Sequence, residues 1–499
     1  MRDSSRTNQL DPHLRQTLAI LAGGVFMSVL DMTVVNVALG SLAARLGASV
    51  GAVQWVVTSY LLALAATIPL TGWATRRFSA SRVYFAGLIL FTAGSALCAA
   101  AWSLPSLCAF RAVQGVGAGV LFPVAQTILS REAGPRRMAK TMSIFGSVAV
   151  IAPILGPILG GFVVDHLSWR WIFLVNIPIG LASLALAVGR LPEPTTEPVG
   201  RPDLAGLLMV GGGLPLLIYG CSELAAGASF ASLPGGGLFL LGLALIVQFV
   251  FHALHVTRPL LDLRLFRNHT YGLASAALFV FSAAVFGPYL VMPLFFQQVQ
   301  HASPMLAGTL FASQGLGAAA AIHTGGRLAG RVPAGLLATI GAAAATLFTI
   351  PLATFTASTS HGVAVAVLIG RGFGIGLVMI PLIAAALSEL TPPQLPDGSA
   401  QNNVLQRIGS SIGTAAIAVL LSSELARSGD HSSASVAHAY NVTLWAAVGL
   451  GAAVLPFTLA LLRRQLALAR KPAAGGPATG TIPAPIGELT TADSRTQAG

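Results

Sequence analysis

The sequence predicts an all-α integral membrane protein with two six-helix bundles and an inserted pair of helices. Three observations lead to this fold class. Hydrophobic residues make up 55% of the 499 residues and charged residues only 9%, whereas a soluble domain carries roughly 25% charged residues. The apolar residues gather in runs of about 20, the length that an α-helix needs to cross a bilayer. Basic residues concentrate in alternate connections between these runs, as in multi-pass membrane proteins.

Fourteen such runs are long enough to span a membrane. We expect spans over residues 17–39, 54–74, 83–102, 105–129, 140–164 and 169–189, then 204–221 and 236–256, and finally 271–299, 305–324, 334–356, 361–387, 399–423 and 441–463. They divide the chain into a cytoplasmic N-terminus (1–16), an N-terminal bundle (17–189), a Pro-rich cytoplasmic connector (190–203), an extra two-helix hairpin (204–256), a C-terminal bundle with its leading loop (257–463) and a cytoplasmic tail (464–499). The composition of the tail predicts that it is disordered.

The distribution of basic residues predicts the orientation. With the N-terminus in the cytoplasm, most of the 28 Lys and Arg residues fall on the cytoplasmic side, and the outer loops hold only Arg45, Arg170 and Arg427. This asymmetry predicts that both termini are cytoplasmic and that the protein lies in the cell inner membrane. It also explains the net charge of +12 without a nucleic-acid partner. The three cysteines lack metal-ligand spacing and we find no cofactor motif, so we expect neither a metal nor a cofactor.

Two stretches recur at equivalent places in the two bundles. The fourth span contains "RAVQGVGAGVLFP" (Arg111–Pro123), and the fourth span of the C-terminal bundle contains "RGFGIGLVMIP" (Arg371–Pro381). The connections between the second and third spans of each bundle contain "GWATRR" (Gly72–Arg77) and "GRLAGR" (Gly326–Arg331). Such a repeat predicts two parallel bundles related by an axis along the membrane normal.

Asp31 is the one acidic residue that lies well inside a predicted span. It lies roughly 20 Å from the cytoplasmic end of its span, and Arg111 lies roughly 9 Å below the outer surface. A charge inside a membrane is costly unless it is paired or hydrated. We therefore expect Asp31 and Arg111 to be neighbours beside a water-filled cavity. Two interpretations remain open: a protonation switch or substrate contact, and a static ion pair that fixes the packing of the bundle.

Other residues of the spans and of the repeated loop are candidate functional positions. Polar or charged side chains that we expect to line a cavity are Asn36, Gln54, Gln114, Arg371 and Asn402. The loop motif contributes Gly72, Arg76 and Arg77. The fifth span holds "APILGPILGG", in which prolines bend the helix and a G-x-x-x-G face permits close packing. These residues form either a hinge between the bundles or ordinary tight packing: Pro153, Gly156, Pro157, Gly160 and Gly161.

Several stretches together resemble the major facilitator superfamily, and in particular its fourteen-span drug:H+ antiporter branch. "LDMTVVNVAL" (Leu30–Leu39) resembles the first-span motif of that branch, "RAVQGVGAG" (Arg111–Gly119) the fourth-span motif of the superfamily, and "GPILGG" (Gly156–Gly161) the fifth-span antiporter motif. Further branch-like stretches are "QWVVTSYLLALA" (Gln54–Ala65), "WRWIFLVNIPIG" (Trp169–Gly180) and "PLLDLRLFRN" (Pro259–Asn268). The resemblance covers nearly the whole chain except the tail.

The resemblance implies the major facilitator fold, alternating access and export of a compound against protons. It implies a role of Asp31 in coupling or cation recognition and a role of Arg111 in proton transfer, and it favours the hinge interpretation of Pro157. The family loop between spans two and three usually reads G-x-L-A-D-R-x-G-R. Here Arg76 stands at the Asp position, and Gly330 stands there in the second copy. The acidic latch of the family is therefore missing from both copies.

Together these observations predict a secondary exporter of drugs or other small amphipathic compounds, driven by inward proton flow. We expect its partners to be a small-molecule substrate, protons and the lipid bilayer. A periplasmic adaptor is compatible with this class but has no support in the sequence. Alternatives are a passive or differently coupled metabolite exporter and a non-transporting membrane sensor on the same scaffold. We do not expect an enzyme, because the sequence offers no catalytic constellation.

Overall fold

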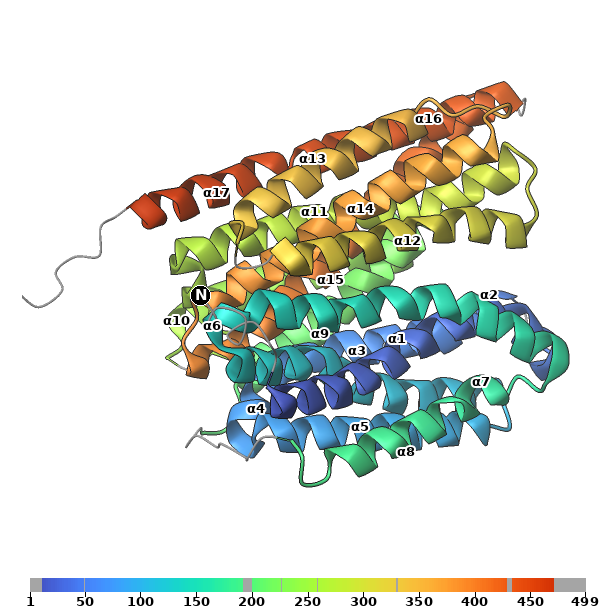
Figure 1. Cartoon of the computed structure of the whole chain (residues 1–499). Helices are drawn as coiled ribbons and strands as arrows, with labels where there is room; N and C mark the ends of the chain where they lie inside the picture. The colour runs from blue at the N-terminus through green and yellow to red at the C-terminus, as the bar shows by residue number, and fades with distance from the viewer. Residues whose placement is uncertain are drawn as a thin grey trace, which may run out of the picture.

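The computed structural model describes residues 11–48, 50–191, 200–225, 227–257, 259–328, 331–428 and 433–470. Its long helices run side by side and form two groups, with α1 to α8 on one side and α11 to α17 on the other (Figure 1). We call these groups the N-terminal bundle and the C-terminal bundle. The division agrees with the repeat in the sequence, since each bundle contains one copy of each repeated stretch.

The N-terminal bundle comprises α1 (Pro12–Leu46), α2 (Val50–Val53), α3 (Trp55–Thr67), α4 (Thr71–Phe78), α5 (Ala80–Ala99), α6 (Leu104–His166), α7 (Trp171–Leu174) and α8 (Asn176–Ala187). The segment between the second and third spans is helical, because α3 continues through a 3₁₀ turn (Ile68–Leu70) into α4. Ser79, with φ 78°, ends α4, and its hydroxyl accepts the N–H of Arg82 at the start of α5.

Helix α6 contains the predicted fourth and fifth spans. A capping box of Ser103 and Ser106 begins it. Gly134 (φ 61°, ψ 172°) interrupts the helical backbone, so α6 consists of two helical segments joined there. Glycine suits this position because a positive φ is unfavourable for residues that carry a Cβ. The helix packs against α1, α3 and α5 of its own bundle and also against α12, α14 and α15.

The C-terminal bundle comprises α11 (His269–Gln298), α12 (Pro304–Leu328), α13 (Ala334–Leu352), α14 (His361–Ser388), α15 (Leu395–Ser428), α16 (Ser433–Ala452) and α17 (Leu455–Arg470). Helix α14 packs between α12 and α13, and α11 packs along α15. Backbones approach closely at Gly409 and Gly413, where an added Cβ would lie 2.4 Å from the Phe279 carbonyl oxygen and 2.2 Å from that of Ala283. Gly409 therefore lies at the same height along the bundle as Phe279, and Gly413 at the same height as Ala283.

Helices α9 (Leu204–Ala225) and α10 (Leu238–His255) form the extra hairpin. Helix α9 packs against both α3 and α15, so the hairpin contacts both bundles. Helix α10 packs on α9 and exposes apolar side chains that fit a lipid-facing surface: Leu240, Leu241, Val247, Phe251 and Leu254. At the start of α9, Asp203 accepts hydrogen bonds from the Gly206 and Leu260 N–H groups and contacts the His252 ring, which anchors the hairpin.

In the part of the chain that the structure describes, twelve helices are long and apolar enough to cross a membrane. The multi-pass prediction is thus supported, whereas the count of fourteen stays a prediction. Two predicted spans account for the difference. The span 140–164 lies in the second segment of α6, and the span 169–189 corresponds to the shorter apolar stretch Trp171–Ala187.

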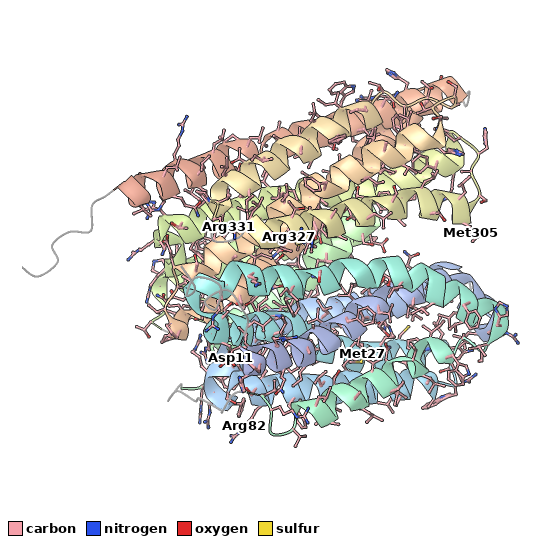
Figure 2. The ribbon with its side chains drawn as sticks, in the orientation of Figure 1. Asp11, Met27, Arg82, Met305, Arg327 and Arg331 are labelled. Carbon is pink, nitrogen blue, oxygen red and sulfur yellow. The ribbon has the colours of Figure 1, made fainter. Side chains whose placement is uncertain are left out.

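Basic residues gather at one end of the molecule. Figure 2 places Asp11, Arg82, Arg327 and Arg331 toward this end and Met305 at the opposite one. We call the first the basic end; the sequence predicts that it is cytoplasmic. Helix α17 also reaches it and continues to Arg470, beyond the predicted end of the bundle at residue 463. The first residues of the predicted disordered tail, 464–470, are therefore helical, and the rest of the tail and part of the predicted connector lie outside the described residues.

Candidate functional site

Asp31 lies in the part of α1 that packs against α6. Its neighbours Leu30 and Val34 are buried, as is Asp31 itself. Ser28, which shares the Asp31 face of α1, donates its hydroxyl to the Val25 carbonyl of its own helix at 2.9 Å. The carboxylate must therefore find its hydrogen-bond donors on neighbouring helices.

Three donors from two other helices surround the Asp31 carboxylate. Arg111 Nη1 donates to Asp31 Oδ2 at 2.5 Å. Gln114 Nε2 and Asn176 Nδ2 donate to Oδ1 at 3.0 and 2.8 Å. Gln114 also accepts a bond from Arg111 Nη1 at 2.8 Å. We call these four residues the Asp31 network; the predicted proximity of Asp31 and Arg111 is confirmed.

The Arg111 guanidinium is held by further groups. Its Nε donates to the Val56 carbonyl at 3.1 Å, and its central carbon lies 4.1 Å from the centroid of the Tyr60 ring, a cation–π contact. Tyr60 in turn donates to the Ser28 carbonyl at 3.2 Å. Arg111 Nη2 has no hydrogen-bond partner among the described residues. The network thus links α1, α3 and α6, and Asn176 brings in α8.

Among the described residues, no open space borders this pair, contrary to the predicted water-filled cavity. The side chains of Asp31 and Arg111 are both 0% exposed, and Gln114 and Asn176 are also fully buried. The prediction failed because it assumed that hydration had to compensate the charges. Amide side chains of Gln114 and Asn176 supply that compensation instead.

Arg371 occupies the corresponding repeat position of the C-terminal bundle but has different partners. Its Nε donates to Thr349 Oγ1 at 3.1 Å, its Nη1 to Gln314 Oε1, and its Nη2 to the Val285 carbonyl at 3.5 Å. All three acceptors are neutral, and Arg371 is 2% exposed. It contributes to the wall of a small cavity of about 20 Å³ between α11, α13, α14 and α16. This void is too small for a substrate, so the expectation that Arg371 lines a substrate cavity stays a prediction.

At the basic end, Arg76 of α4 forms an ion pair with Asp397 of α15, Nη1 to Oδ1. The pair joins the two bundles, so an ion pair links them at this loop although the acid of the family motif is missing from it. The cation now stands on the N-terminal bundle and the carboxylate on the C-terminal bundle. An added Cβ on Gly72 would lie 2.4 Å from Asp397 Oδ1, so a larger residue would displace the carboxylate from its present position. Arg77, the third residue of the motif, is exposed.

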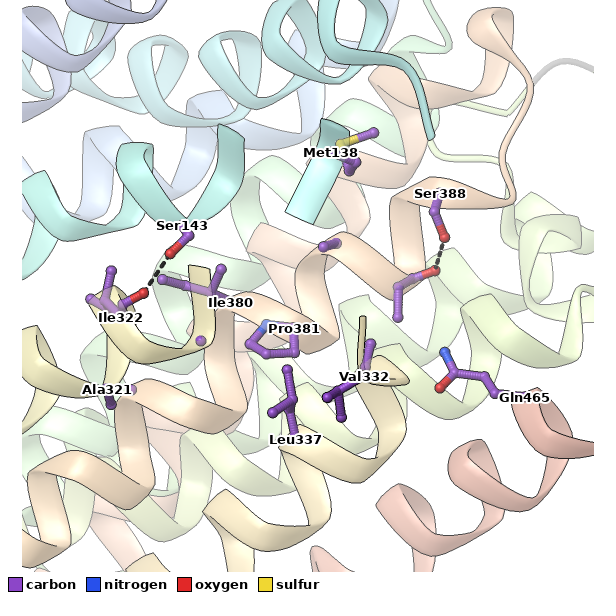
Figure 3. A pocket seen from close by; sticks show the side chains of 15 residues that line it. Met138, Ser143, Ala321, Ile322, Val332, Leu337, Ile380, Pro381, Ser388 and Gln465 are labelled. Atoms are coloured by element: carbon purple, nitrogen blue, oxygen red, sulfur yellow. Dashed lines mark hydrogen bonds between the residues drawn. The ribbon is translucent and has the colours of Figure 1, made fainter. Parts of the chain in front are cut away.

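Further contacts close the seam between the bundles near the same end. Asn403 Nδ2 donates to Gln126 Oε1 at 2.9 Å, and Ser143 Oγ donates to the Ile322 carbonyl at 2.7 Å. A cavity of about 180 Å³ adjoins the second contact. Figure 3 shows its lining, which comes from α6, α12, α13, α14 and α17 and includes Met138, Leu337, Pro381 and Gln465. The side-chain oxygen of Gln465 accepts a hydrogen bond from the Gly335 N–H at 2.8 Å. The lining of this cavity therefore offers chiefly apolar surface.

The remaining predicted residues are dispersed. Gln54 is exposed beside the first turn of α3. Asn402 is buried on α15 and accepts the Ser275 hydroxyl at 2.7 Å, which ties α15 to α11. The side chain of Asn36 lies outside the described residues. These three residues therefore do not join the Asp31 network or one another in a common site.

The predicted hinge falls in the second segment of α6. An added Cβ on Gly156 would lie 2.0 Å from Thr33 Oγ1, so the glycine permits close contact with α1. Gly160 is buried in the same segment. The side chains of Pro153 and Pro157, and Gly161, lie outside the described residues. Close packing is thus present at Gly156, and the hinge interpretation stays a prediction.

Two residues of these sites were not singled out from the sequence. Asn176 is a polar residue within an otherwise apolar predicted span, which is a usable signal. Asp397 lies in the first turn of α15 and looks like an ordinary helix-start acid, which gives no indication of its partner. Only the tertiary arrangement reveals that it faces Arg76.

Comparison with known proteins identifies the family. The model of the Major Facilitator Superfamily matches residues 21–414. The chain belongs to this superfamily. A multidrug resistance protein B homolog of Mycobacterium tuberculosis is 38% identical over 468 residues, covering 91% of this chain and 84% of the relative. The multidrug export protein EmrB of Haemophilus influenzae is 32% identical over 406 residues, covering 80% and 78%.

Solved structures agree on the fold of this superfamily member. The human organic anion transporter MFSD10 superposes with a TM-score of 0.64 at 15% identity, covering 90% of this chain and 100% of that one. At this identity the likeness shows the fold alone. Family and fold together make the chain a multi-pass membrane protein of a transporter family and not an enzyme. The resemblance to multidrug efflux transporters stated from the sequence is confirmed.

Proposed function

We propose that this protein is a secondary active efflux transporter. It exports drugs or other small amphipathic compounds across the cytoplasmic membrane by alternating access, in exchange for protons. The names of the relatives, multidrug resistance and multidrug export proteins, support the class of cargo. Both termini and the basic end are cytoplasmic in this proposal. The second segment of α6 and the α7–α8 stretch complete fourteen spans.

The Asp31 network carries the proposal of proton coupling. Within the described spans, Asp31 is the carboxylate that lies deep in the membrane, and its negative charge holds Arg111 Nη1. A proton on Asp31 removes this charge and leaves the guanidinium without its anionic partner. Because the network joins α1, α3, α6 and α8, proton uptake would change the packing of most of the N-terminal bundle.

Helix α6 provides a path from the network to the seam between the bundles. Its first segment carries Arg111 and Gln114, and further along it carries Gln126, which bonds Asn403 of the other bundle. Its second segment carries Ser143, which bonds α12. A movement of α6 that follows protonation therefore acts on the contacts that close the basic end. The Arg76–Asp397 pair is the electrostatic part of this closure.

Everted membrane vesicles test the proposal. With an acidified lumen, a panel of amphipathic cations, anions and neutral compounds should trigger proton release through the native chain, and Asp31→Asn should abolish it. Asp262→Asn is the matched control, since Asp262 caps a short 3₁₀ helix outside the spans. Undiminished exchange in Asp31→Asn, with equal expression, would contradict the coupling role and favour the static ion pair.

The same vesicles separate the alternatives. A passive facilitator would equilibrate the compound without any proton release in the native chain. A non-transporting sensor would show neither flux nor proton release while it still binds a ligand. Downhill flux that survives in Asp31→Asn while proton exchange is lost is the signature that the proposal requires.

A further inference from the structure

Arg407 is a charged residue within α15 that has no role in the mechanism above. It lies ten positions after Asp397, which corresponds to about 15 Å along the helix from the basic end. An arginine side chain is too short to bring its charge back across this distance. The guanidinium therefore stays at membrane depth, where a charge normally marks a functional position.

Arg407 lies on the face of α15 that is turned toward the N-terminal bundle. Asn403, one helical turn earlier on the same face, bonds Gln126 of α6. Arg407 lies within electrostatic range of Tyr60 of α3, the ring that also forms the cation–π contact with Arg111. Gly409 and Gly413, which pack against α11, lie on the opposite face. Arg407 thus faces the space between the bundles and not the interior of its own bundle.

The other two arginines of the spans have their hydrogen-bonding groups largely satisfied, and Arg407 does not. Arg111 is bonded to Asp31, and Arg371 to three neutral oxygens. For the Arg407 side chain, the described residues provide neither a hydrogen-bond acceptor nor a carboxylate, and the residue is partly exposed. A guanidinium has five N–H donors to satisfy. The seam therefore holds a half-buried cation without an anionic partner among the described residues.

Aromatic side chains lie on the outer side of this cation. Phe286 and Tyr289 stack on α11 with their centroids 5.5 Å apart, and they are 45% and 42% exposed. Helix α11 lies between α12 and α15, both of which contact α6. From the matched levels of Gly409 and Phe279, the aromatic pair lies about 16 Å farther from the basic end than Arg407. An elongated amphipathic compound can bridge this separation.

We propose that Arg407 binds the anionic group of the exported compound, so that preferred substrates are amphipathic anions with a carboxylate or sulfonate at one end and an apolar, aromatic body at the other. The proposal rests on the efflux function above. Guanidinium binds such planar or branched oxyanions through two parallel hydrogen bonds. The Phe286–Tyr289 pair accommodates the body of the compound.

A matched set of fluorescent probes tests the assignment with the purified full chain in lipid nanodiscs. The probes share the dansyl group: dansylglycine carries a carboxylate, its methyl ester is neutral, and a dansyl amide of 2-aminoethyltrimethylammonium is a cation. We expect Arg407→Gln to weaken dansylglycine binding at least ten-fold and to leave the ester within two-fold. Arg407→Lys should retain part of the affinity, and Arg407→Glu should shift the preference to the cation. Arg82→Gln, an exposed arginine at the basic end, is the control (Figure 2).

Each outcome either supports or overturns the assignment of Arg407 as an anion site. If native chain fails to bind dansylglycine, or if Arg407→Gln weakens the three probes equally, the assignment is overturned. Proton release in vesicles keeps this result separate from the efflux proposal. Exchange of the ester or the cation, but not of dansylglycine, would refute the anion site and leave efflux standing. Arg407-dependent binding of dansylglycine without any probe-driven proton release would refute coupled efflux and leave the anion site standing.

Discussion

The two bundles place an arginine at equivalent repeat positions and surround it differently. Arg111 in the N-terminal bundle is bonded to a carboxylate, and that carboxylate is bonded to two amides. Arg371 in the C-terminal bundle is bonded to an amide, a hydroxyl and a carbonyl, all neutral. Only the first arrangement contains a group that can take up a proton. Under the proposed coupling, the titratable group therefore belongs to the N-terminal bundle, and the C-terminal bundle contributes a buried arginine with neutral partners.

The comparison also explains why burial alone does not identify the coupling site. Both arginines are almost completely buried, at 0% and 2% exposure. What distinguishes them is the consequence of losing the cation. Without Arg111, the buried Asp31 carboxylate loses its cationic partner. Without Arg371, only neutral acceptors lose a hydrogen-bond donor. Stability measurements on matched variants can expose this asymmetry.

The largest expected effect comes from Arg111→Gln. Breaking a buried ion pair by removing one partner costs about 3–5 kcal/mol. Arg371→Gln should cost about 1–3 kcal/mol, the usual range for a buried neutral group left unsatisfied. Thermal unfolding of the detergent-solubilised chain, followed by fluorescence-detected size-exclusion chromatography, measures both. We expect a clearly lower midpoint for Arg111→Gln than for Arg371→Gln.

A double variant sharpens this first prediction. Asp31→Asn removes the stranded charge, so Arg111→Gln combined with Asp31→Asn should be more stable than Arg111→Gln alone. Equal midpoints for Arg111→Gln and Arg371→Gln, or strictly additive effects at Asp31 and Arg111, would show that the two sites do not differ in the proposed way.

The next largest effect on stability concerns two equivalent helix contacts, that of α15 with α11 and that of the second segment of α6 with α1. In the C-terminal bundle an added Cβ on Gly413 meets the backbone carbonyl oxygen of Ala283 at 2.2 Å, and in the N-terminal bundle one on Gly156 meets the Thr33 hydroxyl at 2.0 Å. A side chain can rotate away and a backbone cannot. Gly413→Ala should therefore cost about 3 kcal/mol and Gly156→Ala about 1 kcal/mol, the two ends of the usual range for overpacking.

Combination with Thr33→Ala separates these two cases. This substitution removes the hydroxyl from the contact with Gly156→Ala and should recover part of the thermal midpoint, although the Thr33 Cβ still lies 2.6 Å from the added Cβ position. It should not recover Gly413→Ala. Recovery of both variants would mean that the loss does not arise at these contacts.

Much of the fold follows from local sequence properties. Apolar runs, Arg-rich connections and the repeat predict two bundles and an inserted pair because span length and charge asymmetry are set by the bilayer and act on each segment separately. The Asp31–Arg111 contact was predictable because helical rise fixes depth, and two opposite charges at one depth favour pairing. The count of spans was harder, since the segment after Gly134 continues α6 and Trp171–Ala187 is short.

The site contacts that were missed depend on rotation and on pairing between distant segments. Depth alone does not show that Asn176 of α8 turns toward Asp31. Arg76 and Asp397 are 321 residues apart in the chain, and their contact depends on how the two bundles meet. The motif position alone shows that the family acid is missing, and it cannot reveal the acid on the opposite bundle that pairs with Arg76.

A third prediction concerns the ion pair between Arg76 and Asp397, which joins the two bundles. Arg76→Gln and Asp397→Asn each remove the ion pair across the seam, whose side chains are 14% and 12% exposed. A loss of about 1–2 kcal/mol would raise the population with an open basic end by roughly 5–30-fold. A cysteine at Ser399, buried near the latch, reports opening through its reaction rate with a membrane-impermeant maleimide in everted vesicles, in a chain whose three native cysteines are replaced by serine.

The charge exchange provides the control for the latch. Arg76→Asp combined with Asp397→Arg restores an ion pair with the polarity reversed, so labelling should return toward the native rate. Arg77→Gln, an exposed neighbour, should leave labelling unchanged. Labelling that stays slow in both single variants would show that the other seam contacts hold the basic end closed without this pair.

The smallest effect contrasts the buried Asp31 with Asp203, a carboxylate outside the spans at the start of α9. Burial raises the pKa of Asp203, but hydrogen bonds from the Gly206 and Leu260 N–H groups and contact with the His252 ring outweigh it and hold the pKa below its ordinary value. A lowered pKa in the folded state means that the stabilisation is complete above the unfolded value of about 3.9 and is lost as the pH falls through the lower folded value. Asp203→Asn should therefore lower the thermal midpoint at pH 7 by an amount equivalent to about 1 kcal/mol, and its difference from the native chain should shrink only below about pH 4. Asp262→Asn controls for general effects of acid, and a native-to-variant difference that already disappears between pH 7 and pH 5 would contradict the assignment to Asp203.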